Sequence, residues 1–78
     1  MSVKEEVLSV IAKTLDLEPS ELGDEVSLYS GAGVDSTEMV EVAVALSKAL
    51  GIKLAQGEIS NKMPLKDIIS VIEKKKQA

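Results

Sequence analysis

Three segments of the chain repeat apolar residues at three- and four-residue spacing, and this pattern constrains the fold more than any other feature. Such spacing places the apolar side chains on one face of a helix, whereas a strand would alternate every second residue. The repeats cover residues 3–16, 39–50 and 64–75. We therefore predict an all-α fold, with three or four helices around one small core.

Residues that favour helix ends flank these repeats. Ser2 is a predicted N-cap with Glu5 three positions later, and Asp35 is a second with Glu38 reaching back from the third helical position. Gly51 follows the second repeat as a C-terminal cap. The second main helix therefore starts directly after Asp35.

A long loop is predicted between the first two main helices, over residues 17–35. Pro19 ends the first helix, and the apolar residues that follow are spaced too irregularly for a strand or a long helix. We expect the loop to be pinned across the core, with one short turn over 20–23. Gly31 and Gly33 are expected to supply positive φ. A weaker helical piece is predicted over 56–61.

Length and composition narrow the function classes. A chain of 78 residues buries about 60% of its unfolded surface and has little room for a deep catalytic cleft. It contains no cysteine and no histidine, which excludes a disulfide framework, a thiolate nucleophile and a Ser-His-Asp arrangement. We predict one domain over 1–78, no metal site and no enzymatic activity. The chain is expected to be a carrier or binding module.

The charge is unevenly distributed. The net charge of −4 combines an acidic first half, with 10 acidic and 2 basic residues up to Glu41, and a basic second half. An acidic chain with one aromatic residue is a poor nucleic-acid binder. The acidic N-terminus lacks the apolar run of a signal peptide, and no apolar stretch is long enough for membrane insertion. We expect a cytoplasmic protein, and a monomer.

One stretch carries candidate chemistry. Ser36 stands at the start of the second main helix, directly after a loop with two glycines. Unpaired N–H groups and the positive end of the helix dipole favour an attached phosphate ester there. No histidine is available to deprotonate this serine, so we interpret Ser36 as an acceptor that a separate enzyme modifies. The alternative is that Asp35 and Ser36 form an ordinary helix start.

These motifs together resemble an acyl carrier protein over nearly the whole chain. The resemblance covers the first apolar helix, Leu-Asp-Leu-Glu-Pro-Ser-Glu-Leu at 15–22, Ser27-Leu28 and Gly33-Val34-Asp35-Ser36. It continues through the second helix and through Ile68, Ile69 and Ile72 of the last. The family fold is a small up-and-down bundle of three main helices plus one short helix, with a long loop before the second main helix.

The resemblance implies that Ser36 carries a 4′-phosphopantetheine arm from coenzyme A, attached by a phosphopantetheinyl transferase, with Asp35 as the flanking cap. The thiol of this cofactor would hold acyl groups as thioesters. Implied partners are acyl-transferring and ketosynthase-type enzymes. The resemblance places partner recognition at Asp35, Thr37, Glu38, Met39, Glu41 and Lys48. It places the acyl chain in a pocket formed by Leu28, Met39, Val40, Leu46, Ile59, Met63 and Ile68.

Two departures from the family pattern bear on the pathway. Thr37 replaces the leucine that the family usually has after the modified serine. The second half of the second main helix, with which the family recognises its partners, is usually rich in acidic residues, but here this region is a stretch containing Lys48 and Lys53. We therefore expect a carrier in fatty-acid or in specialised lipid or polyketide biosynthesis, with a dedicated pathway favoured. The alternatives are a peptidyl or aminoacyl carrier and an unmodified helical interaction module.

Overall fold

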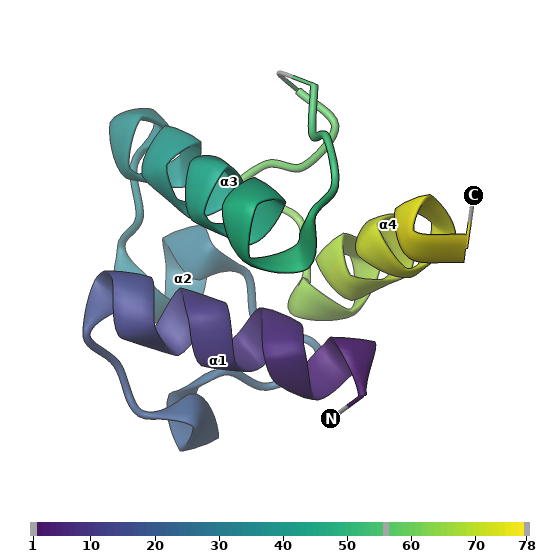
Figure 1. Cartoon of the computed structure of the whole chain (residues 1–78). Coiled ribbons are helices and arrows are strands. Elements are labelled where there is room, and N and C mark those ends of the chain that lie inside the picture. Colours follow the sequence, from purple (N-terminus) through teal and green to yellow (C-terminus); the bar gives the residue numbers. More distant parts are fainter. Residues whose placement is uncertain (1, 56, 78) are drawn as a thin grey trace.

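The computed structural model describes residues 2–55 and 57–77. In this part of the chain the elements are α1 (Val3–Leu15), a 3₁₀ turn η1 (Pro19–Glu21), α2 (Leu28–Ala32), α3 (Ser36–Leu50) and α4 (Leu65–Gln77). The predicted all-α class and the three main helices are confirmed. Figure 1 shows α1 and α3 side by side and running in opposite directions, with α4 lying obliquely to them. Helix α1 packs mainly against α3 and also against α4.

The predicted caps are confirmed. The Ser2 hydroxyl accepts a hydrogen bond from Glu5 N at 3.2 Å. At the other end of α1, Asp16 adopts a left-handed conformation with φ of 56°. Helix α3 ends at Gly51, whose φ of 66° is left-handed and favours glycine.

One hydrophobic cluster receives side chains from every helix. Most of its members lie at the helical spacing of the three repeats, and the others are anchors from the loops. In the second repeat Val40 and Ala49 are exposed, whereas Val42 is fully buried. The buried residues are Val7, Ile11, Ala12, Leu22, Leu28, Val34, Met39, Val42, Leu46, Leu50, Ile59, Leu65, Ile68, Ile69 and Ile72.

The short helix lies elsewhere than predicted. Residues 57–61, predicted to be helical, form turns and bends, and Gln56 lies outside the described residues. Gly57 has a φ of 90°, which a right-handed helix does not allow. The short helix is instead α2, within the predicted long loop. At five residues it is too short to show a helical period.

The glycines of α2 act differently from one another. Gly33 ends α2 in a left-handed conformation, as predicted. Gly31 does not have positive φ, so that prediction was wrong. It is helical, and a Cβ there would overlap the Val26 side chain. Gly31 therefore allows close packing.

Two segments far apart in sequence, 24–29 and 61–66, are joined by backbone contacts. Ser27 and Pro64 form an isolated antiparallel bridge, and further hydrogen bonds run on both sides of it. These are Tyr29 N to Asn61 O at 2.8 Å, Leu65 N to Val26 O at 2.9 Å and Lys66 N to Asp24 O at 3.0 Å. The chain entering α2 is thereby fixed to the chain entering α4.

Candidate functional site

Ser36 is the first residue of α3, and it is exposed. The cap of this helix is Asp35, whose Oδ1 accepts from Glu38 N at 2.8 Å, while Glu38 Oε1 accepts from Asp35 N at 3.5 Å. Within the described residues the Ser36 hydroxyl makes no hydrogen bond of its own. Because Asp35 and Glu38 complete the capping box, the Ser36 oxygen is not needed to cap the helix.

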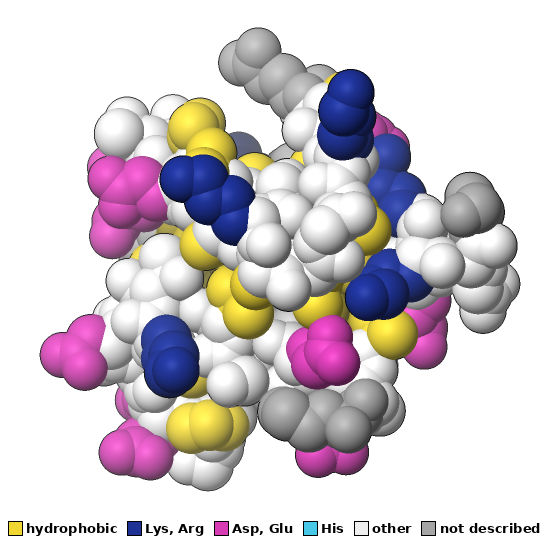
Figure 2. All heavy atoms as spheres, in the orientation of Figure 1, with side chains coloured by type: hydrophobic (Ala, Val, Ile, Leu, Met, Phe, Trp, Pro, Cys, Tyr) yellow, Lys and Arg dark blue, Asp and Glu magenta, His cyan; other side chains and the backbone are white. Residues whose placement is uncertain are grey.

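The surface around Ser36 is acidic. Asp35, Glu38 and Glu41 are all exposed on the first two turns of α3, and Thr37 is exposed between them. Lys48 lies in the last turn of the same helix. Figure 2 shows acidic, apolar and basic side chains close together over α3. The two ends of this helix therefore offer opposite charges to a partner.

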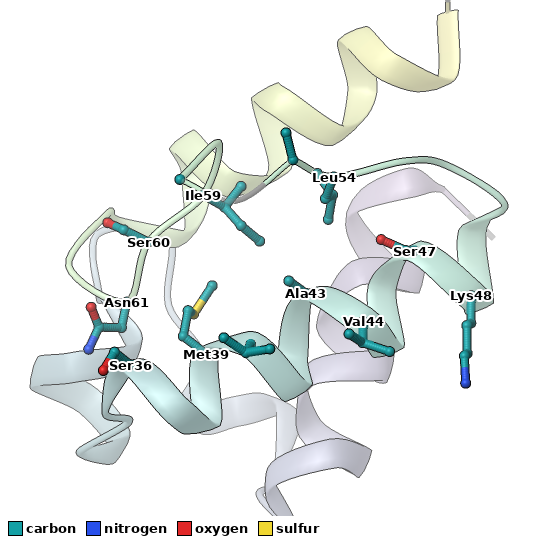
Figure 3. Close-up of a pocket in the computed structure, with 13 residues that line it drawn as sticks. Ser36, Met39, Ala43, Val44, Ser47, Lys48, Leu54, Ile59, Ser60 and Asn61 are labelled. Carbon is teal, nitrogen blue, oxygen red and sulfur yellow. The ribbon is translucent and has the colours of Figure 1, made fainter.

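A cavity of about 630 Å³ opens beside Ser36, between α3 and the loop that leads to α4. Figure 3 shows Met39 and Ala43 directed from α3 toward Ile59 and Leu54 of the loop, with Ser36 and Asn61 at one end. The cavity is therefore apolar in its middle and polar at the end where Ser36 lies. Its lining residues are Ser36, Met39, Val40, Ala43, Val44, Ser47, Lys48, Leu54, Ala55, Gly57, Ile59, Ser60 and Asn61.

The predicted pocket residues divide into two groups. Met39, Val40 and Ile59 line this cavity. Leu28, Leu46 and Ile68 do not line it and are fully buried in the core, whereas Met63 is half-buried and its sulfur accepts from Ser60 N at 3.2 Å.

Met39 was also predicted to contact partners. Its side chain is directed into the cavity and the residue is 6% exposed, so it offers a partner little surface. Val40 is 56% exposed and Val44 is 47% exposed, although both belong to the cavity rim. Val40 and Val44 are therefore the exposed large apolar side chains of α3 among the described residues.

Several lining residues were not anticipated from the sequence. Ala43, Val44 and Ser47 follow Met39 and Val40 at helical spacing, so that spacing could have identified them. Leu54 could not have been identified, because it lies in a loop where the sequence has no period.

Asn61 connects the cavity loop to the segment that carries Ser36. The side-chain amide of Asn61 donates a hydrogen bond to the backbone carbonyl of Val34, two residues before Ser36. The backbone carbonyl of Asn61 accepts a hydrogen bond from Tyr29 N. These two hydrogen bonds hold the cavity loop against the segment that leads into α3.

An ion pair holds the same loop to α4. Lys75 Nζ lies 2.7 Å from Glu58 Oε2. Its hydrogen bond lowers the pKa of the Glu58 carboxyl below the ordinary value of 4.5, and the Ala55 N–H contributes in the same direction. The carboxylate form of Glu58 is thereby favoured near neutral pH.

A hydroxyl that makes no hydrogen bond among the described residues thus lies at a helix N-terminus and beside a mainly apolar cavity, in a sequence without histidine or cysteine. In the described part of the chain, none of the helices has the length and apolar character needed to cross a membrane.

The chain belongs to the family described as the phosphopantetheine attachment site, whose family model matches residues 5–72. It is 29% identical over 76 residues to an acyl carrier protein of Solidesulfovibrio magneticus, with 97% of each chain covered. It is 30% identical over 73 residues to an acyl carrier protein of Campylobacter hominis, covering 94% of this chain and 92% of that one. It is also 29% identical to the meromycolate extension acyl carrier protein of Mycobacterium tuberculosis, covering 91% of this chain and 65% of that protein.

Family membership makes 4′-phosphopantetheine the prosthetic group and makes the chain a non-catalytic carrier. Its partners are a phosphopantetheinyl transferase and acyl-handling enzymes. The described residues fit the group, because the α3 N-terminus has an exposed hydroxyl and favours a phosphodiester. When bound, the group supplies a thiol that the chain itself lacks.

Proposed function

We propose that Ser36 is the attachment point of the phosphopantetheine arm, and that the chain carries acyl intermediates on it as thioesters. The observation that carries this proposal is the free Ser36 hydroxyl at the mouth of an apolar cavity. Asp35 contributes by capping α3, which holds Ser36 at its first turn. Residues 1–78 act as one carrier domain.

An acyl cargo is favoured over an aminoacyl or peptidyl cargo. The middle of the cavity is lined by Met39, Ala43 and Ile59, which offer apolar contacts and no charged group for an ammonium. Burying an alkyl chain there is favourable by about 0.8 kcal/mol for each methylene. An unpaired ammonium in the same place would be costly.

Partner enzymes are proposed to contact the exposed face of α3. Asp35, Glu38 and Glu41 would meet basic groups of a partner near Ser36, where the phosphodiester adds further negative charge. Thr37 and Lys48 lie on the same helix. A partner surface that meets the C-terminal end of α3 should not be basic, because it would repel Lys48. This combination supports a dedicated lipid or polyketide pathway over general fatty-acid synthesis.

The attachment is tested by incubating the purified chain with coenzyme A, magnesium and a promiscuous phosphopantetheinyl transferase, followed by intact mass measurement. We expect one phosphopantetheine increment, which disappears in Ser36→Ala. Ser47→Ala is the matched control, because Ser47 also lines the cavity and should leave the increment unchanged. An unmodified wild-type chain, under conditions that modify a known carrier, would refute the proposal.

The pathway is tested by comparing ketosynthases. The acyl-loaded chain is offered to a general fatty-acid ketosynthase and to the ketosynthase of its own pathway, identified by reaction with the loaded chain in a lysate of the source cells. Faster turnover with the second enzyme is expected. Equal rates would contradict a dedicated pathway and leave the attachment site unaffected.

A further inference from the structure

A second hollow, of about 420 Å³, adjoins the cavity on the side away from Ser36. The two spaces share Ser47, Leu54 and Ala55 as lining residues. Figure 3 shows Leu54 extending from the loop toward α3 near Ser47, at the opposite end of the cavity from Ser36. Leu54 has the largest apolar side chain of the three, and it is half-buried. It therefore forms the wall between the two spaces.

The chemistry of the lining also changes at this wall. The first cavity has one charged lining residue, Lys48, whereas the second hollow has Lys53, Glu58 and Lys75 beside the apolar Ile52. The Glu58–Lys75 ion pair lies within that second lining. In the second hollow an alkyl chain would contact Ile52 and the aliphatic stems of the lysines, but it would have to avoid the charged groups.

We propose that Leu54 sets the longest acyl chain that this carrier can shelter, by acting as the end wall of the cargo cavity. This inference rests on the proposed function, since it requires acyl cargo on Ser36. About eleven helical residues separate Ser36 from Ser47, which corresponds to roughly 16 Å along α3 at the usual helical rise. The acyl chain begins at the thiol of the arm and not at Ser36, so it occupies only the part of this length that lies beyond the thioester. An acyl chain that reaches Leu54 from there is at its limit, and further carbons remain in solvent.

Replacing Leu54 with alanine removes the wall and joins the two spaces. Ile52 and the aliphatic stems of Lys53 and Lys75 then supply apolar surface beyond the former wall. The sheltered length should increase by at least two carbons, about the reach of the atoms removed from the leucine. Leu54→Phe should have the opposite effect and shorten the sheltered length.

The test loads each variant with acyl-phosphopantetheine arms of increasing chain length, using the transferase and acyl-coenzyme A, and measures thioester cleavage by hydroxylamine. In the wild-type chain, cleavage should slow by up to about fourfold for each sheltered methylene, and then stay constant. In Leu54→Ala the constant region should start at a longer chain. Melting temperatures of the same loaded samples provide a second readout, because sheltered cargo stabilises the fold.

Ile52→Ala is the matched control. Ile52 lines the second hollow and is not part of the first cavity, so the length limit should remain that of the wild type. Each limit is read by comparing chain lengths within one variant, so a general loss of stability does not move it. If Leu54→Ala does not fold, Leu54→Val is measured instead, with a smaller shift in the same direction.

The outcomes separate the two proposals. Absence of any mass increment on Ser36 would refute the attachment site itself. A loaded wild-type chain whose cleavage rate is independent of chain length would refute sheltering in the cavity, and with it the role of Leu54. A wild-type limit that is unchanged in Leu54→Ala and in Leu54→Phe would overturn the role of Leu54 alone.

Discussion

The structure assigns the capping of α3 to Asp35 and not to Ser36, and this can be tested by measuring the stability of variants at both positions. Asp35→Ala removes the carboxylate that accepts from Glu38 N at 2.8 Å. Loss of an N-cap costs about 1 kcal/mol, and loss of a negative charge at a helix N-terminus adds about 0.3–1 kcal/mol. The free energy of unfolding should therefore fall by about 1–2 kcal/mol. In a domain of this size, that lowers the melting temperature by roughly 5–15 °C.

Ser36→Ala should change much less, because the Ser36 hydroxyl does not cap the helix. A change within about 0.5 kcal/mol is expected for an exposed position of this kind. Both variants are measured unmodified, by circular dichroism during heating and during urea titration. Asp35→Asn is the control, since it keeps an acceptor oxygen and loses only the charge. The reasoning is refuted if Ser36→Ala is as destabilising as Asp35→Ala.

Three further predictions concern the core, the ion pair and the charge distribution. Leu46→Ala should destabilise the fold by about 2–5 kcal/mol, measured by urea unfolding, while the cargo length limit stays unchanged because Leu46 does not line the cavity. The Glu58 pKa is lowered in the folded chain, so the stability due to the pair with Lys75 is present above pH 4.5 and is lost as pH falls through the folded-state value. When the free energy of unfolding is measured as pH is lowered, Lys75→Gln should lose less stability than the wild type. The same pH profile in both proteins would contradict a stabilising role of the pair. The unmodified protein should melt at a higher temperature with added salt, because salt screens repulsion within its acidic first half, and a melt independent of salt would reject that cause.

Much of the fold could be predicted because its causes are local. Helical spacing and capping residues depend on neighbours within four positions, so the sequence was sufficient to predict three main helices and their ends. Helix α2 could not be predicted in this way. Its five residues are held by the Ser27 cap and by backbone contacts to residues 61–66, which are remote in sequence.

Tertiary contacts also explain why the helical piece predicted over 56–61 was misplaced. Residues 57–61 have a weak helical pattern, but Gly57 adopts a positive φ and Glu58 pairs with Lys75 of α4. Contacts with a distant helix thus determine the conformation of this loop.

For the site, the sequence alone determined that a serine follows a capping aspartate at the start of an amphipathic helix, in a chain with no thiol of its own. Tertiary structure decided which apolar residues face a cavity and which face the core. Leu46 and Val44 lie on the same helix, yet Leu46 is fully buried and Val44 is at the cavity rim. Periodicity identifies the faces of a helix, but the position of the loop carrying Leu54 and Ile59 determines what covers each face, and that position depends on contacts with α2 and α4.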